Sequence, residues 1–256
     1  MYKLNEGLWY YIVSKPEANL GEWKYILLTV GFALAAMLAG YLLGSINSAV
    51  IISKIFYGDD IRNHGSGNAG LTNMLRTYGA KSALFTLLGD MLKTAIAIFI
   101  AGVLGGFGYI GGISVGNATC IMPLAYLAGL FVVIGHIFPI YYGFKGGKGV
   151  LCTATMALIL TPIEFAILIS LFIAIVAITK YVSLGSVVVG ILYPVTVHGH
   201  YEVIFPNVEH SLDGVTALIT IILAILIVYC HRENLKRISN GTERKISIGG
   251  KKNKDK

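Results

Sequence analysis

Two glycine-rich stretches carry the side chains best suited to chemistry on an anion. They are HGSGNAGLTN at residues 64–73 and GFKGGKGV at residues 143–150. Glycine lets backbone N–H groups approach an anion closely, and successive N–H groups form anion-binding concavities. The polar side chains in or beside the two stretches are Arg62, Ser66, Asn68, Thr72, Asn73, Lys145 and Lys148. Together they predict binding of one or two phosphate groups, with an ordinary pair of turns as the alternative.

Both stretches resemble nucleotide-binding motifs only superficially. Gly65, Gly67 and Gly70 form a literal G-x-G-x-x-G, but a dinucleotide site also needs a preceding strand and an acidic residue about 20 positions on. The acidic residue at that distance, Asp90, lies in an apolar run. GFKGGKGV lacks the P-loop spacing and the Ser or Thr after its lysine. Dinucleotide binding and P-loop hydrolysis are therefore disfavoured.

A few polar residues lie inside or at the ends of apolar runs. Asp90 and Lys93 are three residues apart and share one helix face. Charges at that depth face the protein interior or a water-filled cavity, although a purely structural ion pair is the alternative. His136 and His231 end two apolar runs and are either site residues or interface histidines. His198, His200 and His210 fall on the opposite membrane face and are given no role.

The remaining composition excludes several kinds of chemistry. The cysteines show no zinc-type spacing and are interpreted as buried free thiols. Two histidines without clustered carboxylates or thiols make no metal site, and there is no Asp-rich run. The sequence also lacks His-x-x-x-x-Asp and a G-x-S-x-G nucleophile elbow. We therefore expect chemistry with no metal and no covalent serine intermediate.

The elements that must position these residues are membrane helices. The chain is 55% hydrophobic and 13% charged, with a mean hydropathy of +0.73, whereas about a quarter of a soluble domain is charged. Runs of spanning length need about 20 residues. The predicted spans are 25–56, 82–104, 119–138, 149–161, 163–180, 184–198 and 214–231. The fourth is short and is separated from the fifth by Thr161-Pro162, so the pair is interpreted as a hairpin.

Charge distribution orients these spans. Segments 105–118 and 199–213 contain no Lys or Arg, whereas the intervening segments and the tail are basic. The positive-inside bias then predicts an all-α protein of seven transmembrane helices, with the N-terminus outside and the C-terminus cytoplasmic. A six-span alternative would move a basic segment outside. Residues 1–24 form an outer extension, 25–231 the seven-span domain and 232–256 a cytoplasmic basic tail. The net charge of +7 is thus a membrane signal, and no nucleic acid is expected as a partner.

Span parity brings the polar stretches together. Spans one, three and seven all end on the inner face, followed by the two glycine-rich stretches and by HRENLKRISNGTE. We therefore expect one cytoplasm-facing site built from all three.

These stretches resemble the three motifs of the bacterial acyl-phosphate-dependent glycerol-3-phosphate acyltransferases. The matching segments are DIRNHGSGNAGLTNMLRTYG, GHIFPIYYGFKGGKGV and HRENLKRISNGTE. The resemblance implies an enzyme of the bacterial cell membrane, with seven spans and a cytoplasmic site. It implies transfer of a fatty acyl group from acyl phosphate to the 1-hydroxyl of glycerol 3-phosphate, the first acylation of phospholipid synthesis. The products are 1-acylglycerol 3-phosphate (lysophosphatidic acid) and inorganic phosphate, with no cofactor and no obligate protein partner.

The resemblance also implies residue roles. The catalytic set is His231, Asn234, Ser45 and Arg62, of which Ser45 and Arg62 hold the acyl-phosphate end. The substrate-binding set is Gly65, Ser66, Gly67, Asn68, Asn73, Lys93, His136, Lys145, Gly146, Gly147, Lys148, Gly149 and Ser183. Glu233 is expected to brace the third motif. His231 or the substrate phosphate accepts the proton.

Two positions depart from the family pattern: Asn47 replaces a proline and Thr94 a glycine. A transporter of a phosphorylated metabolite is the alternative function, because anion-binding loops and an intramembrane lysine would serve it too. No internal repeat supports that alternative.

Overall fold

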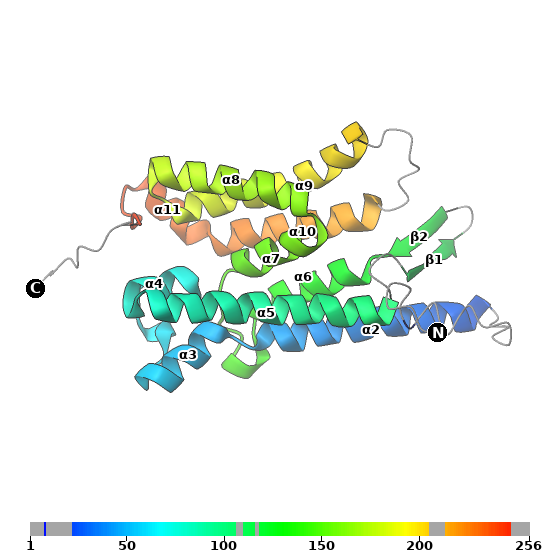
Figure 1. The fold of residues 1–256 in the computed structure, drawn as a ribbon, viewed down its shortest axis with the longest axis horizontal. Helices are drawn as coiled ribbons and strands as arrows, with labels where there is room; N and C mark the ends of the chain where they lie inside the picture. The colour runs from blue at the N-terminus through cyan, green and yellow to red at the C-terminus, as the bar shows by residue number, and fades with distance from the viewer. Residues whose placement is uncertain (1–7, 9–21, 106–109, 116–117, 205–212, 247–256) are drawn as a thin grey trace, which may run out of the picture.

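The structure is a computed structural model that describes Leu8 and residues 22–105, 110–115, 118–204 and 213–246 (Figure 1). Most of the expected outer extension 1–24 and residues 247–256 of the basic tail therefore lie outside the described residues. The elements are α2 (Glu22–Ser45), α3 (Ser48–Tyr57), η1 (Ile61–Asn63), α4 (Leu71–Tyr78), α5 (Ala80–Gly105), β1 (Ile110–Val115), β2 (Ala118–Met122), α6 (Leu124–Ile137), η2 (Ile140–Tyr142), α7 (Val150–Leu160), α8 (Pro162–Thr179), α9 (Val182–Ile204), α10 (Asp213–Cys230) and α11 (Arg232–Ser239).

The long helices are apolar enough to cross a membrane. Within the described ranges, five stretches qualify by length and composition: Ile26–Tyr57, Ala80–Gly105, Leu124–Tyr142, Pro162–Thr179 and Val182–Gly199. A sixth qualifies if α10 and α11, bent by 52° at His231, count together. The expected fourth span is α7, whose 11 residues reach about 16 Å against a hydrocarbon core of about 30 Å. The helical architecture is confirmed, while the count of seven spans and the orientation of the termini stay predictions.

One expected loop has regular structure. Residues 105–118 were predicted as a loop followed directly by a span from residue 119, but β1 pairs antiparallel with β2. Strand β2 ends at Met122, because Pro123 lacks the N–H that would extend the ladder. Helix α6 then starts at Leu124. The all-α prediction thus needs correcting by one two-stranded hairpin.

The helices form two groups with a short helix between them (Figure 1). Helices α2, α5 and α6 pack together, and α8, α9 and α10 form the second group. Helix α7 contacts α5, α6 and α8, and the Thr161-Pro162 junction starts α8 as expected. Helices α4 and α11, which belong to different motifs, lie at the same end of the molecule.

The first span breaks between α2 and α3. The Asn47 side chain accepts a hydrogen bond from the Val50 N–H at 3.0 Å and so caps α3. Its amide also donates to the carbonyl of Ala69 at 3.3 Å, in the first glycine-rich stretch. Asn47 therefore both starts the new helix direction and ties the break to the loop that follows it. Thr94, the other departure, is buried and donates to the carbonyl of Asp90 within its own helix.

Glycine allows α2 and α6 to approach each other closely. A Cβ on Gly40 or Gly44 would overlap the backbone of Ala128 or Val132, and one on Gly135 would overlap the carbonyl of Tyr41. Close backbone approach at small residues is the usual basis of helix packing in membranes. Since α6 carries His136 at its end, this contact sets the position of a predicted site residue.

We expect Gly44→Ala to lower the melting temperature of the protein in detergent, because backbone atoms cannot move aside for the new methyl group. Overpacking of this kind costs about 1–3 kcal/mol. Gly31→Ala is the matched control on the same helix, since open space surrounds that position. Equal melting temperatures for the two variants would contradict the proposed close contact.

Candidate active site

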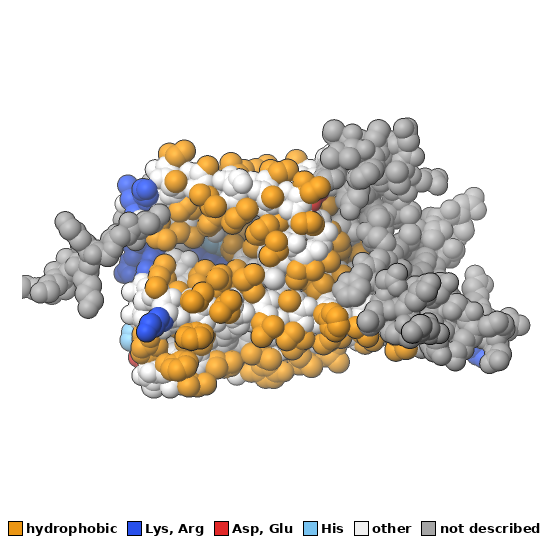
Figure 2. Space-filling model, viewed as in Figure 1, with side chains coloured by type: hydrophobic (Ala, Val, Ile, Leu, Met, Phe, Trp, Pro, Cys, Tyr) orange, Lys and Arg blue, Asp and Glu red, His pale blue; other side chains and the backbone are white. Residues whose placement is uncertain are grey.

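A cavity of about 590 Å³ lies between the two helix groups. Figure 2 shows the corresponding hollow, with basic side chains visible inside it and apolar side chains around it. Its polar lining comprises Ser66, Asn68, Thr72, Asn73, Arg76, Asp90, His136, Lys148, Thr153, Ser183, Ser186, His231, Asn234, Arg237, Thr242, Glu243 and Arg244. Its apolar lining includes Leu87, Leu151, Ala154, Phe165, Leu168, Ile169, Phe172, Val189, Tyr193 and Ile227. One site thus contains side chains from all three motifs, as parity predicted.

Asn73 organises the first glycine-rich loop. Its amide nitrogen donates to the carbonyls of His64 at 2.9 Å and Asn68 at 3.0 Å, and its oxygen accepts from the Ser66 N–H at 3.1 Å. Gly65 has a φ of 60° and leaves no room for a Cβ beside the Asn73 side chain. The loop is therefore held by its own asparagine, which lines the cavity together with Gly65, Ser66 and Asn68. Gly67 adopts a φ of 71° for the same turn but is not among the lining residues.

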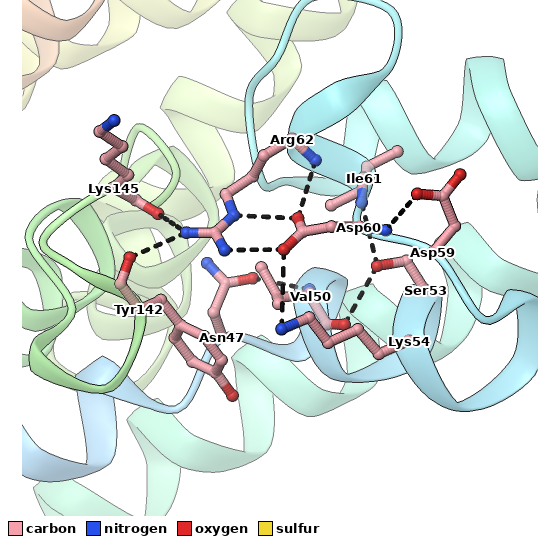
Figure 3. A network of polar contacts seen from close by, with 10 residues as sticks. All are labelled: Asn47, Val50, Ser53, Lys54, Asp59, Asp60, Ile61, Arg62, Tyr142 and Lys145. Atoms are coloured by element: carbon pink, nitrogen blue, oxygen red, sulfur yellow. Dashed lines mark hydrogen bonds and ion pairs between the residues drawn. The ribbon is translucent and has the colours of Figure 1, made fainter.

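Arg62 lies outside the cavity lining, in contrast to its expected place at the acyl-phosphate end. Its guanidinium donates to both carboxylate oxygens of Asp60, at 2.9 and 2.7 Å. It also donates to the carbonyls of Tyr142 at 2.8 Å and Lys145 at 3.2 Å (Figure 3). The Arg62 guanidinium holds the pKa of Asp60 at about 2, so this pair stays charged at neutral pH. These N–H groups of Arg62 all donate to protein acceptors in the first and second motifs, so Arg62 joins the two motifs.

The glycines of the second motif serve packing more than anion binding. The N–H groups of Gly146 and Gly147 donate to the carbonyls of Ile137 and His136, at 3.2 and 3.0 Å. A Cβ on either glycine would overlap His136. These two residues do not line the cavity, whereas Gly149 does and marks the start of α7. The N–H groups of Gly146 and Gly147 are therefore already occupied, and the part of this motif that reaches the cavity is the N-terminus of α7.

Two lysines of the second motif have different surroundings. Lys145 is exposed and, like Gly146 and Gly147, is absent from the cavity lining. Lys148 lines the cavity, is largely buried and donates a hydrogen bond to the side-chain oxygen of Asn234. Burial lowers the pKa of Lys148 to about 8, with nearby Arg237 acting in the same direction and Glu243 opposing it. Lys148 is thus the lysine of this motif that faces the cavity.

Glu243 makes the contacts that brace the third motif. One oxygen of Glu243 accepts from Ser183 at 2.8 Å and from Asn234 at 2.7 Å. The other accepts from Arg237 at 2.7 Å. Burial alone would raise the pKa of Glu243, but these three hydrogen bonds outweigh it and lower the pKa. Glu233 is exposed in the first turn of α11, where a negative charge suits the helix dipole, so the structure gives the bracing contacts to Glu243 and the role of Glu233 stays a prediction.

His231 lies where α10 and α11 meet, and its ring is buried against its own helix. Its Nδ1 is 2.8 Å from the carbonyl oxygen of Ile227. Because a carbonyl only accepts, Nδ1 carries the proton and Nε2 keeps its lone pair. His231 lines the cavity and therefore presents an acceptor, which suits a general base.

Two further predicted residues lie behind the cavity wall. Ser45 is fully buried, donates to the carbonyl of Tyr41 at 2.8 Å and accepts from the Ile140 N–H at 3.4 Å. Lys93 forms an ion pair with Asp90 at 2.9 Å and is likewise absent from the lining. Both had been predicted to contact substrate, but in the structure they contact the protein, so their positions differ from expectation.

Three arginines of the cavity lining were not predicted as site residues from the sequence: Arg76, Arg237 and Arg244. Arg76 follows Thr72 by four residues on α4, and Arg237 follows Asn234 by three on α11, so each shares a helix face with a predicted site residue. That spacing was the available signal. Within the described ranges, no three His, Cys, Asp or Glu side chains converge in a way that could hold a metal ion.

Comparison with known proteins identifies the family of this site. A sequence profile described as "Glycerol-3-phosphate acyltransferase" matches residues 34–241. The chain belongs to the glycerol-3-phosphate acyltransferase family. Proteins of that name from Mycoplasmopsis agalactiae and Bacillus subtilis are 40% and 38% identical to it, over 87% and 84% of this chain and 98% and 97% of theirs.

A solved structure shares the fold as well. The crystal structure of PlsY (YgiH), an integral membrane glycerol 3-phosphate acyltransferase, in its glycerol 3-phosphate form, is 30% identical with a TM-score of 0.70. The match covers 84% of this chain and 96% of that chain. The family expected from the three motifs is therefore confirmed, and this glycerol-3-phosphate acyltransferase homologue is a multi-pass membrane protein of bacterial type.

We expect Glu243→Gln to lower the turnover of glycerol 3-phosphate acylation about tenfold or more, because a neutral amide cannot replace three hydrogen bonds to a carboxylate. Glu233→Gln is the matched control on the same motif and should retain the wild-type rate. The measurement is steady-state product formation by purified protein in detergent. Equal rates for the two variants would contradict the proposal that Glu243, and not Glu233, braces the third motif.

Proposed function

We propose that the chain transfers a fatty acyl group from acyl phosphate to the 1-hydroxyl of glycerol 3-phosphate, releasing 1-acylglycerol 3-phosphate and inorganic phosphate. One observation carries the proposal: a single cavity joins a cluster of cations and amides to an apolar wall. A reaction between two phosphorylated substrates, one with a long apolar tail, needs both surfaces within reach of each other.

The polar lining suits two phosphate groups. Lys148, Arg76 and Arg237 supply positive charge, and Arg adds planar donors that match phosphate oxygens. The first N–H groups of α7 have no partner within their helix and carry the positive end of its dipole. Gly149, Val150 and Leu151 bring that helix end to the cavity. Holding both substrates at this surface removes much of the entropic barrier to their reaction.

The apolar lining suits the acyl chain. Leu168 and Phe172 of α8, Val189 and Tyr193 of α9, and Ile227 of α10 form a continuous wall beside the cations. Burying acyl CH₂ groups there is favourable by about 0.8 kcal/mol each if the comparison is with water. A site for a small phosphorylated metabolite alone would not need this wall, which argues against the transporter alternative.

The reaction balances without a further reactant. The 1-hydroxyl oxygen of glycerol 3-phosphate attacks the acyl carbonyl carbon, and the bond from that carbon to the phosphate oxygen breaks. His231 accepts the hydroxyl proton at Nε2, the nitrogen its contact with Ile227 leaves free. The leaving group is inorganic phosphate, which Lys148 and the arginines stabilise as its charge develops. The phosphate then takes the proton from His231 and departs as hydrogen phosphate, so His231 returns to its neutral form.

The proposed topology has seven spans, an outer N-terminus and a cytoplasmic site. Supporting it, the motif loops that line the cavity are basic and lie at one end of the molecule, whereas the loops at the other end lack Lys and Arg. Glycerol 3-phosphate would then enter from the cytoplasm, and the acyl donor from the bilayer.

The test is an assay of purified protein with glycerol 3-phosphate and either palmitoyl phosphate or palmitoyl-CoA, in the presence of a metal chelator. We expect lysophosphatidic acid and phosphate from the acyl phosphate alone. Product only from the thioester would overturn the proposed donor. No product from either donor, with folded protein, would overturn the enzyme and favour the transporter alternative.

The pKa of Lys148 predicts how substrate binding depends on pH. Its ammonium is charged below about pH 8 and neutral above it, so attraction for a phosphate dianion is lost as pH rises through that value. We expect kcat/KM for glycerol 3-phosphate to fall above about pH 8, since this parameter reports ionisation of the free enzyme. Lys148→Arg should remove this alkaline limb, because Arg stays charged throughout the range. An unchanged alkaline limb in Lys148→Arg would contradict the assignment.

A further inference from the structure

A buried ion pair, of which Asp90 lines the cavity and Lys93 lies behind it, contacts one of the cavity histidines. Lys93 and Asp90 are both almost fully buried, with side-chain exposures of 4% and 2%. Asp90 also accepts from the Ser48 hydroxyl at 3.0 Å. On the other side of the pair, the Lys93 ammonium is 3.0 Å from Nδ1 of His136. The cavity histidine therefore has a cation as its direct neighbour.

The partners of Lys93 determine the tautomer of His136. The ammonium lies 2.8 Å from the carbonyl of Ile46, 3.1 Å from that of Gly44 and 2.9 Å from Asp90, all acceptors. An ammonium only donates. The ammonium shares its three hydrogens among these three acceptors and Nδ1 of His136. A protonated Nδ1 would direct its hydrogen at the ammonium, so Nδ1 is the unprotonated nitrogen of the ring. The ring proton of His136 is then on Nε2.

Nε2 is the nitrogen of the His136 ring that is left available to the cavity. His136 lines the cavity although only 4% of the residue is exposed. Its Nε2 lies against the position that a Cβ on Gly147 would occupy. Among the described residues, the polar contacts of the His136 ring are made by Nδ1, and Nε2 has no hydrogen-bond partner there. An unpartnered N–H group in such surroundings needs an acceptor.

We infer that Lys93 is a positioning residue that fixes His136 as an Nε2–H donor to a phosphoryl oxygen of the bound substrates. This inference rests on the proposed function. The two cavity histidines then have opposite roles: Ile227 makes His231 an acceptor, and Lys93 makes His136 a donor. Asp90 balances the charge of Lys93, so the arrangement adds no net charge to the membrane interior.

The first test compares two amide substitutions of His136. His136→Gln places its amide N–H near the position of Nε2, whereas His136→Asn places its amide near Nδ1. We expect His136→Gln to keep most of the activity with palmitoyl phosphate and His136→Asn to lose about tenfold or more in kcat/KM, the scale of one hydrogen bond to a charged group. His198→Gln, on an exposed part of α9, is the control and should match the wild type.

The second test observes the tautomer directly by ¹⁵N NMR of histidine-labelled protein without substrate. The chain has six histidines, and the resonances absent from His136→Gln identify residue 136. We expect a protonated Nε2 and an unprotonated Nδ1 in the wild type and in Asp90→Asn, which keeps Lys93. In Asp90→Asn/Lys93→Met, which leaves no unpaired buried charge, a mixture of tautomers should appear and kcat/KM should fall to that of His136→Asn.

The outcomes separate this inference from the proposed function. A wild-type protein that is inactive with acyl phosphate would overturn the proposed function, while the NMR result still decides the tautomer. A wild-type protein that is active, with equal rates for His136→Gln and His136→Asn, would overturn the donor role. A protonated Nδ1 on His136 would overturn the role of Lys93 whatever the rates.

Discussion

The arrangement of the site depends on how the backbone carbonyl groups at the break in the first span are hydrogen-bonded inside the membrane. A break in a spanning helix exposes carbonyl groups that hydrocarbon cannot hydrogen-bond. Here the Lys93 ammonium of α5 donates to the carbonyls of Gly44 and Ile46 at the break. These hydrogen bonds offset the cost of the exposed carbonyls, so α3 can start in a new direction. The Asn47 amide then binds the first glycine-rich loop to the break through the carbonyl of Ala69. The same ammonium contacts His136, so Lys93 both stabilises the break in the first span and connects that break to the cavity.

The glycine-rich loops owe their shape mostly to contacts within the protein. Asn73 satisfies the carbonyls of the first loop, and the second loop folds back on the His136 backbone. The Arg62–Asp60 pair then joins the two loops through the carbonyls of Tyr142 and Lys145. Since these groups are already hydrogen-bonded within the protein, the groups proposed to bind phosphate are those that line the cavity: Lys148, Arg76, Arg237 and the start of α7. The loops that shape the site and the cations that line its cavity are therefore different groups of residues.

Much of this could be predicted from the sequence, and the limits have physical causes. Hydropathy located the helices and charge asymmetry placed the three motifs together, because both signals are summed over many residues. Individual roles were harder, since residue type does not reveal which way a side chain points. Arg62 and Lys148 are both basic residues of glycine-rich stretches, yet Asp60 engages one and the cavity surrounds the other. Glu233 and Glu243 differ in the same way, because α11 turns the first toward solvent and the chain after it returns the second to Ser183.

Electrostatic balance explains why so many charges can lie beside an apolar wall. Three cations near the cavity have a nearby anion or carbonyl: Lys93 has Asp90, Arg237 has Glu243 and Arg76 donates to the carbonyl of Arg244. Lys148 differs from these three, because its side chain donates to the neutral amide of Asn234. Its charge is therefore the least compensated of the four, which is the reason burial can lower its pKa so far. A phosphate dianion would supply the missing countercharge, so substrate binding and the completion of this charge balance are the same event.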